Sequence, residues 1–395
     1  QPPDGNHLEE SGGDGGMKWE KVKLGDICKY VTSGGTPKSS IKEYYEPKQI
    51  PWLKTKEVNY CRIYETESYI SKDGLDNSSA KMIPQNSVIV AMYGQGDTAG
   101  RVAINKIPLT TNQACCNLII DETKACYEFV YYQLVTLYEK MVSLKNGGAQ
   151  PNLNAAIIKS MEIKLPPLKT QRYIADILSS YDDLIENNQK QIKLLEEAAQ
   201  RLYKEWFVDL RFPGHENTKI VDGVPEGWRR GLLKELISVN YGKDHKKVPD
   251  DGNIPVYGSG GLMRKCNKSL FFGEAVLIPR KGSLNNIMYV DETFWTVDTM
   301  FYATMKQPHT AVFVYFFVKA FDMYSMNIGA AVPSMTTKIL DAMDVLIPDK
   351  ETLEKFDKYA KVYFNKIKTL QGQNEQLKTA RDLLLPKLMS GEVEV

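Results

Sequence analysis

The sequence is poor in histidine and has no cysteine pairs at a metal-binding spacing. Of its four histidines, one lies within the first sixteen residues, and His215, His245 and His309 are far apart along the chain. The six cysteines include no Cys-x-x-Cys pair, so the sequence lacks the ligand spacing of a structural zinc site. Because no secretion signal is visible, we expect reduced thiols and a cytoplasmic protein.

Long hydrophobic runs are also absent. A helix needs about 20 apolar residues to cross a bilayer, and the nearest candidate, AVFVYFFVKAF at Ala311–Phe321, falls short of that length. We therefore expect no membrane association, and we predict that this run forms a buried helix or strand.

The motifs of the common DNA- and nucleotide-modifying enzymes are missing. No GxxxxGK[ST] loop is present to bind ATP phosphates, and GQGDTAG at Gly94–Gly100 does not have the GxGxxG spacing. An amino-methyltransferase needs an Asn/Asp-Pro-Pro-aromatic loop, but LPPL at Leu165–Leu168 lacks the polar acceptor and the aromatic ring. Neither Pro249-Asp250 nor Pro348-Asp349 is followed by a well-spaced Glu-x-Lys, as a nuclease site would require. These absences predict a chain without catalytic residues, metal or cofactor of its own.

A large excess of charge of one sign is absent as well. The formal net charge is +1, so a polyanion such as DNA would have to be bound by local clusters of Lys and Arg. Residues 1–16 are polar, acidic and rich in glycine, and Met17 follows them. This composition is typical of an expression tag, and we predict that the stretch lies outside the fold.

What the sequence does contain is a long internal repeat. IIKSMEIKLP at Ile157–Pro166 returns as ILDAMDVLIP at Ile339–Pro348, and the two copies superpose without a gap. The offset is constant at 182 residues, as Pro151 and Pro333 also show. Each copy precedes a long helical pattern, so the chain is predicted to consist of two similar halves.

Both helical patterns carry apolar residues at seven-residue spacing, which is typical of coiled-coil packing. The predicted helix-pair packing residues are Ile174, Tyr181, Leu195 and Leu202 in the first helix and Phe356, Tyr363, Leu370, Leu377 and Leu384 in the second. Asn188 and Asn374 lie within the apolar seams and are expected to fix the register. Each helix of about 35 residues would reach roughly 50 Å, and we predict that the two pair with each other in antiparallel fashion. Pro386 is expected to kink or end the second helix.

The segments before the helices read as two mixed α/β units. In both, a short helical pattern is expected at the start, at WEKVKL and WRRGLL, and strands follow. SVIVAMYGQGDTAGRVAI matches AVLIPRKGSLNNIMYV, and TTNQACCNLII matches FWTVDTMFYAT, whereas the middles of the units differ in length. The ends of the repeat therefore agree while the interiors diverge, which favours one scaffold with two different recognition surfaces.

The predicted fold class is α+β, with two similar α/β domains separated by two long antiparallel coiled-coil helices and related by a pseudo-twofold internal repeat. The expected boundaries are residues 17–168 and 228–349 for the two domains, 169–211 and 350–395 for the helices with the C-terminal tail, and 212–227 for a linker.

Basic, polar and aromatic residues gather in the predicted loops of both units. Lys and Arg neutralise phosphates, and glycine lets the backbone approach a duplex. Arg101, Gln95, Arg280 and Asn285 are the candidates for base contacts in the major groove. The candidate DNA-binding residues are Thr36, Lys38, Lys54, Lys56, Tyr93, Gln95, Arg101, Gln150, Asn152, Lys243, Lys246, Lys247, Tyr257, Ser259, Arg280, Lys281, Ser283 and Asn285.

Several stretches together carry a family resemblance. They are residues 169–212 after the first unit, VPEGWRRGLLKEL at 224–236, IPVYGSGG at 254–261, AVLIPRKGS at 275–283 and DLLLPKLMSGEVEV at the C-terminus. With these residues the chain resembles the specificity subunits of type I restriction–modification systems, from Met17 onward. No motif in the sequence specifies the target bases or the spacer between them.

The resemblance implies that each unit is a target recognition domain for one half of a bipartite, asymmetric site in double-stranded DNA. It implies that the paired helices set the spacer and dock two methyltransferase subunits, which restriction–motor subunits then join. Adenine methylation with S-adenosylmethionine and cleavage driven by ATP and Mg²⁺ would belong to these partners.

Three other readings of the sequence remain open. The chain could be a specificity protein of a methylation-only or other anti-phage assembly, or a structural coiled-coil adaptor without DNA contact. It could also be a single-chain methyltransferase or nuclease with an unfamiliar site.

Overall fold

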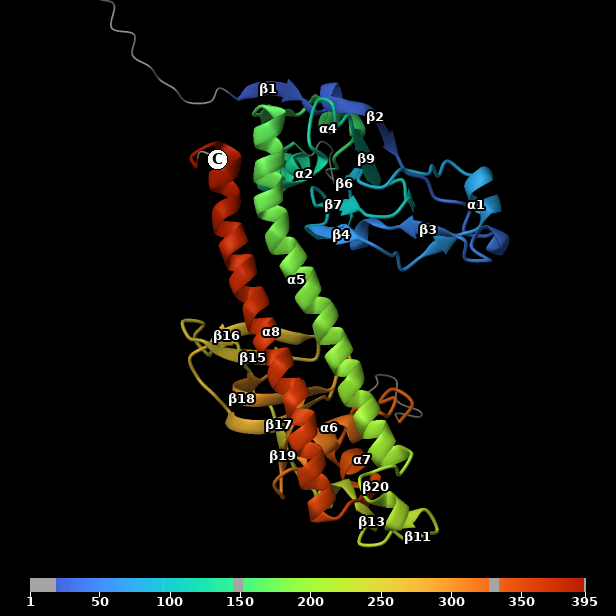
Figure 1. Cartoon of the computed structure of the whole chain (residues 1–395), viewed down its shortest axis with the longest axis vertical. Helices are drawn as coiled ribbons and strands as arrows, with labels where there is room; N and C mark the ends of the chain where they lie inside the picture. The colour runs from blue at the N-terminus through green and yellow to red at the C-terminus, as the bar shows by residue number, and fades with distance from the viewer. Residues whose placement is uncertain (1–18, 95, 145–151, 327–333, 394–395) are drawn as a thin grey trace, which may run out of the picture. The chain divides into compact units, whose positions relative to one another are not determined.

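The computed structural model describes residues 19–94, 96–144, 152–326 and 334–393, and they form two compact units. Unit 1 comprises residues up to Glu186 together with Asn374–Val395, and unit 2 comprises Asn187–Gln373. The long helices α5 (Leu168–Tyr203) and α8 (Lys350–Ser390) each contribute one segment to each unit (Figure 1).

Unit 1 is built on a sheet of five strands in the order β2-β9-β6-β7-β4 and a smaller sheet in the order β5-β3-β8. The strands are β2 (Cys28–Ser33), β3 (Ile50–Leu53), β4 (Cys61–Ile63), β5 (Tyr69–Ile70), β6 (Val88–Ala91), β7 (Val102–Asn105), β8 (Thr110–Thr111) and β9 (Cys115–Ile120). β9 is buried along its whole length between β2 and β6, which explains its nearly unbroken apolar sequence.

Short helices and a two-stranded ribbon complete unit 1. β1 (Glu20–Lys23) pairs with β10 (Glu162–Leu165) in antiparallel fashion. The helices are α1 (Lys72–Asp76), α2 (Tyr127–Thr136), α3 (Tyr138–Ser143) and α4 (Ala155–Ser160), and the 3₁₀ turns are η1 (Leu24–Ile27), η2 (Lys42–Tyr44) and η3 (Thr55–Glu57). Phe129 and Val130 of α2 are fully buried in the same apolar cluster as Val88 and Leu118 of the large sheet.

Unit 2 has one sheet of six strands in the order β14-β19-β17-β18-β15-β16. The strands are β14 (Ile237–Tyr241), β15 (Ile254–Gly258), β16 (Gly261–Cys266), β17 (Phe271–Pro279), β18 (Met288–Thr296) and β19 (Met300–Met305). Around it lie the ribbons β13 (Arg229–Leu232) with β20 (Asp344–Ile347) and β11 (Ile220–Val221) with β12 (Val224–Pro225), the helices α6 (Ala311–Lys319) and α7 (Thr337–Asp341), and the short turns η4 (Lys204–Val208), η5 (His215–Asn217) and η6 (Leu233–Glu235).

The two sheets share one topology and one register. Val88 of β6 lies opposite Leu118 and Ile104, and Val276 of β17 lies opposite Ala303 and Tyr289 in the same arrangement. β3 corresponds to β15, since β3 pairs in parallel with β8, which precedes β9, and β15 pairs in parallel with β18, which precedes β19. β7 and β8 together correspond to the single strand β18, and unit 1 adds β4 at its edge. The predicted internal duplication is therefore present in the fold.

The start of each unit differs from the sequence prediction. A short helix was expected there, but β1 and β13 are strands, followed by the 3₁₀ turns η1 and η6. Each strand pairs with a partner more than 100 residues later in the chain, so local periodicity could not reveal it. The predicted buried element at Ala311–Phe321 is helix α6, and most of its side chains are buried.

The long helices pack against each other in both units, and they run in opposite directions. In unit 2, Phe356 of α8 contacts Tyr203 and Trp206 at the end of α5, with ring centroids 6.3 and 5.8 Å apart. In unit 1, Ile174 of α5 and Leu388 of α8 belong to one buried cluster. Figure 1 shows α8 alongside α5 in each unit.

The predicted seam residues differ in burial. Ile174, Phe356 and Leu370 are buried, whereas Tyr181, Leu195, Leu202, Tyr363, Leu377 and Leu384 are half-buried at the margin of the seam. Asn188 and Asn374 are buried. Pro386 was expected to kink or end the second helix, and it does not end it, because α8 continues to Ser390. Pro386 is exposed, so the face of the helix that lacks its hydrogen bond is open to water.

Candidate nucleic-acid interface

In each unit, the predicted DNA-binding loops converge on one tight turn. In unit 1 this turn is Asn112–Cys115, between β8 and β9, and Cys115 N donates to Asn112 O at 3.1 Å. In unit 2 it is Val297–Met300, between β18 and β19, and Met300 N donates to Val297 O at 2.9 Å. We call these two segments the central turns.

Five backbone hydrogen bonds gather the loops of unit 1 at its central turn. They are Gly34 N to Cys115 O (3.3 Å), Gly35 N to Thr111 O (2.8 Å), Asn112 N to Leu53 O (2.9 Å), Met92 N to Ala114 O (2.8 Å) and Leu153 N to Met92 O (3.0 Å). Four segments that are remote in sequence are thereby held against one turn.

Unit 2 repeats this pattern bond for bond. The equivalents are Gly242 N to Met300 O (3.0 Å), Lys243 N to Thr296 O (2.9 Å), Val297 N to Tyr257 O (3.0 Å), Arg280 N to Thr299 O (2.8 Å) and Met335 N to Arg280 O (2.9 Å). The backbone frame of the site is therefore common to both units, and the side chains that it presents are different.

Glycine is required where the first loop crosses the central turn. A Cβ added to Gly34 would lie 2.2 Å from Thr111 O, and a Cβ added to Gly242 would lie 2.0 Å from Val297 O. Both distances are far below van der Waals contact, so any larger residue would force the loop away from the turn.

A buried tryptophan anchors each loop, but it comes from a different strand in each unit. Trp52 of β3 donates from Nε1 to Gly35 O at 3.0 Å, and Trp295 of β18 donates to Lys243 O at 3.0 Å. Gly35 and Lys243 are equivalent positions, and both β3 and β18 belong to the parallel pair beside them. The equivalent carbonyl oxygens therefore both accept a hydrogen bond from a tryptophan, but the tryptophan lies on one strand of the parallel pair in unit 1 and on the other strand in unit 2.

The candidate residues of unit 1 are distributed around its central turn. Lys38 and Asn152 are exposed, and Tyr93 is half-buried. Thr36 donates a hydrogen bond to Gln113. The ammonium group of Lys54 lies 5.0 Å from the ring centroid of Trp52.

Two further cations of unit 1 are engaged by acids. Arg101 donates to Asn59 at 2.9 Å and to Asp97 at 2.5 Å, and the hydrogen bond with Asp97 raises the pKa of its guanidinium group. Lys56 forms an ion pair with Glu67. Gln95 and Gln150, which were also candidates, lie outside the described residues.

The basic loop of unit 2 presents exposed cations on a fixed backbone. Lys243, Lys246 and Lys247 are exposed. Arg264 of β16 holds this loop by donating to His245 Nδ1 at 3.2 Å and to Val248 O at 2.9 Å. Arg264 was not among the predicted site residues, because its partners lie in another loop.

The second loop of unit 2 begins at Arg280, which packs inside the site. Its guanidinium carbon lies 4.9 Å from the ring centroid of Tyr241 and 5.1 Å from that of Phe301, and its Nη1 donates to Asp298 O at 2.9 Å. Lys281 and Ser283, which follow, are exposed.

Other candidates of unit 2 also have partners within the unit. Asn285 donates to Asp322 at 2.9 Å and accepts from Met323 N at 2.8 Å. The hydroxyl group of Tyr257 donates to Glu292 at 2.6 Å, and burial together with this bond raises the pKa of Tyr257. Ser259 is half-buried, and its carbonyl oxygen accepts from Asn286 at 2.9 Å.

The sequence comparison missed the central turns themselves. TTNQACCNLII and FWTVDTMFYAT were matched from their first residues. The equivalent hydrogen bonds of the two units show instead that Thr111 corresponds to Thr296, which shifts the match by one residue. The corrected match places Gln113 opposite Asp298. Both are exposed residues at the second position of the turn.

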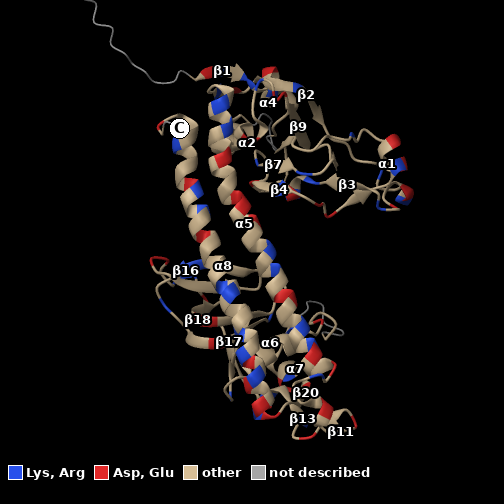
Figure 2. Ribbon diagram, in the orientation of Figure 1, with Lys and Arg blue, Asp and Glu red and all other residues tan. Residues whose placement is uncertain are grey.

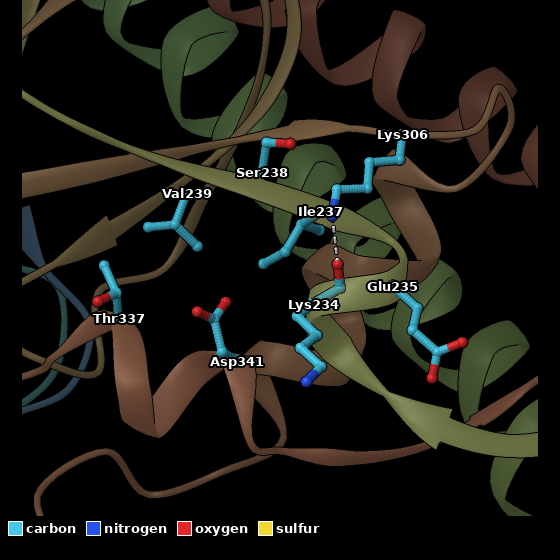
Figure 3. Close-up of a pocket in the computed structure, with 8 residues that line it drawn as sticks. All are labelled: Lys234, Glu235, Ile237, Ser238, Val239, Lys306, Thr337 and Asp341. Carbon is cyan, nitrogen blue, oxygen red and sulfur yellow. Dashed lines mark hydrogen bonds between the residues drawn. The ribbon is translucent and has the colours of Figure 1, made fainter.

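Other parts of the surface offer less support for a binding site. Figure 2 shows Lys and Arg interleaved with Asp and Glu along α5 and α8. A pocket of unit 2, lined by Lys234, Asp341 and six other residues, lies at the far end of β14 and β19 from the central turn (Figure 3). In the described part of the chain, no group of three or more His, Cys, Asp or Glu could hold a metal ion. No described helix is long and apolar enough to span a membrane.

Comparison with known proteins connects this arrangement with a family. The model of the type I restriction modification DNA specificity domain matches residues 17–197 and 225–379. The chain is 28% identical to the MjaIX specificity subunit of Methanocaldococcus jannaschii, over 95% of this chain and 94% of that protein. It is also 28% identical to the EcoR124I/EcoR124II specificity subunit of Escherichia coli, over 50% of this chain and 49% of that protein.

The fold is also similar to that of a solved structure. The type I restriction–modification S subunit from M. genitalium matches with a TM-score of 0.63 and 19% sequence identity, covering 96% of this chain and 98% of that one. The family model matches twice, once over each half of the internal repeat. This chain therefore belongs to the type I restriction–modification DNA specificity family.

Proposed function

We propose that the chain is the specificity subunit of a type I restriction–modification complex, in which each unit reads one half of a bipartite site in double-stranded DNA. The observation that carries this proposal is the repeated central turn. One backbone frame holds equivalent loops in both units, yet the exposed side chains on it differ. Such a pair of surfaces suits a site whose two halves have different sequences.

The chemistry of the loops fits a duplex. Exposed lysines such as Lys243, Lys246 and Lys281 neutralise phosphates and position the protein without reading sequence. Glycines let the backbone approach the duplex closely. Polar side chains at the turn can then reach base edges in the major groove. Because Arg280 and Asn285 have partners inside unit 2, we assign them to positioning the loop rather than to base contacts.

We further propose that the long helices dock two copies of a methyltransferase subunit. In unit 2, Ala198, Leu202 and Tyr363 line a shallow groove on the helix pair, together with Leu194 and the charged residues Glu197, Arg201 and Glu205. The repeat offset places Ala380, Leu384 and Tyr181 at the same positions in unit 1, and all six side chains are half-buried. Leu194 and Leu383, on the same helical segments, are 64% and 65% exposed. Two patches that share these three half-buried positions suit two copies of one partner.

In this proposal the chain supplies recognition and its partners supply catalysis. S-adenosylmethionine would bind to the methyltransferase subunits, and ATP and Mg²⁺ to the restriction–motor subunits. The complex would act in the cytoplasm, where its DNA lies.

The proposal is tested by co-expressing the chain with its methyltransferase partner and sequencing the methylated bases in genomic DNA. We expect one asymmetric motif with two specific halves and a spacer of fixed length. Insertion of one heptad into α5 should change the spacer and leave both halves intact. Methylation without sequence preference, or no binding of the complex to any duplex, would contradict the proposal and favour a structural adaptor.

A further inference from the structure

We propose that Gln113 and Asp298 are the corresponding base-reading side chains of the two units, with Gln113 selecting an adenine and Asp298 selecting a cytosine. This inference rests on the proposed function and names a source of the difference between the two half-sites.

The first argument is their position. Each is the second residue of a central turn, and the loops with candidate phosphate contacts surround that turn. Ala114 and Cys115 beside Gln113 are buried, as are Val297 and Met300 on either side of Asp298. Gln113 and Asp298 are the exposed residues of their turns. In each unit, a DNA groove that accepts the surrounding loops would therefore contact the exposed side chain of the central turn.

The second argument is the chemistry of Gln113. Its Oε1 accepts a hydrogen bond from the Thr36 hydroxyl group, which orients the amide and leaves the Nε2 hydrogens available. An oriented carboxamide can accept from adenine N6 and donate to adenine N7 at the same time. Thymine and cytosine offer no such donor and acceptor pair, and guanine presents two acceptors.

The third argument is the chemistry of Asp298. A carboxylate only accepts hydrogen bonds, so it suits the N4 amino group of cytosine and is repelled by the N7 and O6 acceptors of guanine. No described residue hydrogen-bonds to this carboxylate. The guanidinium group of Arg280 is bonded to Asp298 O at 2.9 Å and lies beside the contacting rings of Tyr241 and Phe301. That fixed cation offsets the repulsion between the carboxylate and nearby phosphates.

The two positions can be tested by isosteric exchange in the complete complex with its methyltransferase partner. Relative affinities for a library of duplexes, each carrying one base-pair change in the methylated motif, give the base preference at every position. Asp298→Asn should replace a cytosine preference with an adenine preference at one base pair. Gln113→Glu should do the reverse at one base pair of the other half-site. Each change should alter the preference by about 5- to 150-fold.

Matched controls separate these effects from a general loss of charge or amide. Asp291→Asn alters an exposed acid on β18, away from the central turn, and Gln376→Glu alters an exposed amide on α8. Asp291→Asn should leave every base preference within twofold of the parent, and Gln376→Glu, which lies on the proposed docking face, should leave the preferences within twofold in whatever complex assembles. Thermal unfolding of all four variants should match that of the parent, because none of the side chains is buried.

The inference is overturned if Asp298→Asn and Gln113→Glu leave all base preferences unchanged, including the case in which affinity falls uniformly. A uniform fall would indicate a contact with phosphate or a structural role. Unfolding of either variant would also count against it, since it would reveal a structural role for an exposed side chain. If the parent complex itself lacked base preferences, the proposed function would fail instead, so the two failures are distinguishable.

Discussion

Replacement of Gly242 by alanine is the most direct test of the central-turn geometry. The added Cβ would lie 2.0 Å from Val297 O and 2.8 Å from Thr296 O, and both are backbone atoms that cannot rotate away. The loop must therefore lift, which removes the bonds from Gly242 N to Met300 O and from Lys243 N to Thr296 O.

The expected cost follows from these contacts. Overpacking of this kind costs about 1–3 kcal/mol, and each lost hydrogen bond costs about 0.5–1.5 kcal/mol. Because the loop can relax toward solvent, we expect a total of about 2–4 kcal/mol. For a unit of this size, about 2–4 °C is lost per kcal/mol, so Tm should fall by roughly 5–15 °C.

The assay combines thermal unfolding of Gly242→Ala with the base preferences of the complex. We expect weaker discrimination in the half-site read by unit 2 and unchanged discrimination in the other half. Gly260→Ala is the matched control, because its Cβ would meet nothing within 4 Å. It should change stability by less than about 1 kcal/mol. Equal effects of the two substitutions, or a Gly242→Ala variant indistinguishable from the parent, would refute the reasoning.

Three further predictions concern single side chains. Lys281→Ala should reduce the slope of log K against log salt by about one, whatever the DNA sequence; an unchanged slope would remove Lys281 from the phosphate contacts. Arg381→Ala should destabilise unit 1 by about 3 kcal/mol, because the partly buried carboxylate of Asp182, which also accepts a hydrogen bond from Tyr132, would lose its cation. Denaturant unfolding would measure this loss, and a change below about 1 kcal/mol would contradict the prediction. Burial acts to raise the pKa of Asp349, but hydrogen bonds from Thr352 and Trp228 outweigh it and lower that pKa. Asp349 therefore stabilises the fold above the unfolded-state pKa of about 3.9, and this contribution is lost as pH falls through the folded-state value; between pH 5 and pH 3 the parent should lose more stability than Asp349→Asn, and parallel curves would argue against the role.

The architecture could be predicted because it follows from regular spacings of apolar residues and prolines along the sequence. Seven-residue periodicity in the two helices and a constant offset between Pro166 and Pro348 survive changes of individual residues. The strand β1 could not be predicted, since its pattern is set by pairing with β10. The end of α8 was also missed, because exposure of Pro386 lets the helix continue.

The candidate site could be predicted only as a set of loops. The sequence identified Gly34 and Gly35 in unit 1 and Arg280 in unit 2 by their residue types, but it contained no sign that the loops of each unit meet at a central turn. The meeting of these loops depends on backbone hydrogen bonds between residues 19 to 81 positions apart, such as Gly35 N to Thr111 O. A one-residue slip in the match of the repeats was enough to hide the equivalence of Gln113 and Asp298.

The division of the chain has a consequence for engineering. The second unit is one uninterrupted stretch, Asn187–Gln373, and it is inserted between the two pieces of the first. Unit 2 could therefore be exchanged for that of a relative as a single cassette, with both junctions inside helices whose sequence period is known. Unit 1 offers no such shortcut, because Leu388 and Met389 of α8, which follow unit 2 in the sequence, belong to its buried core.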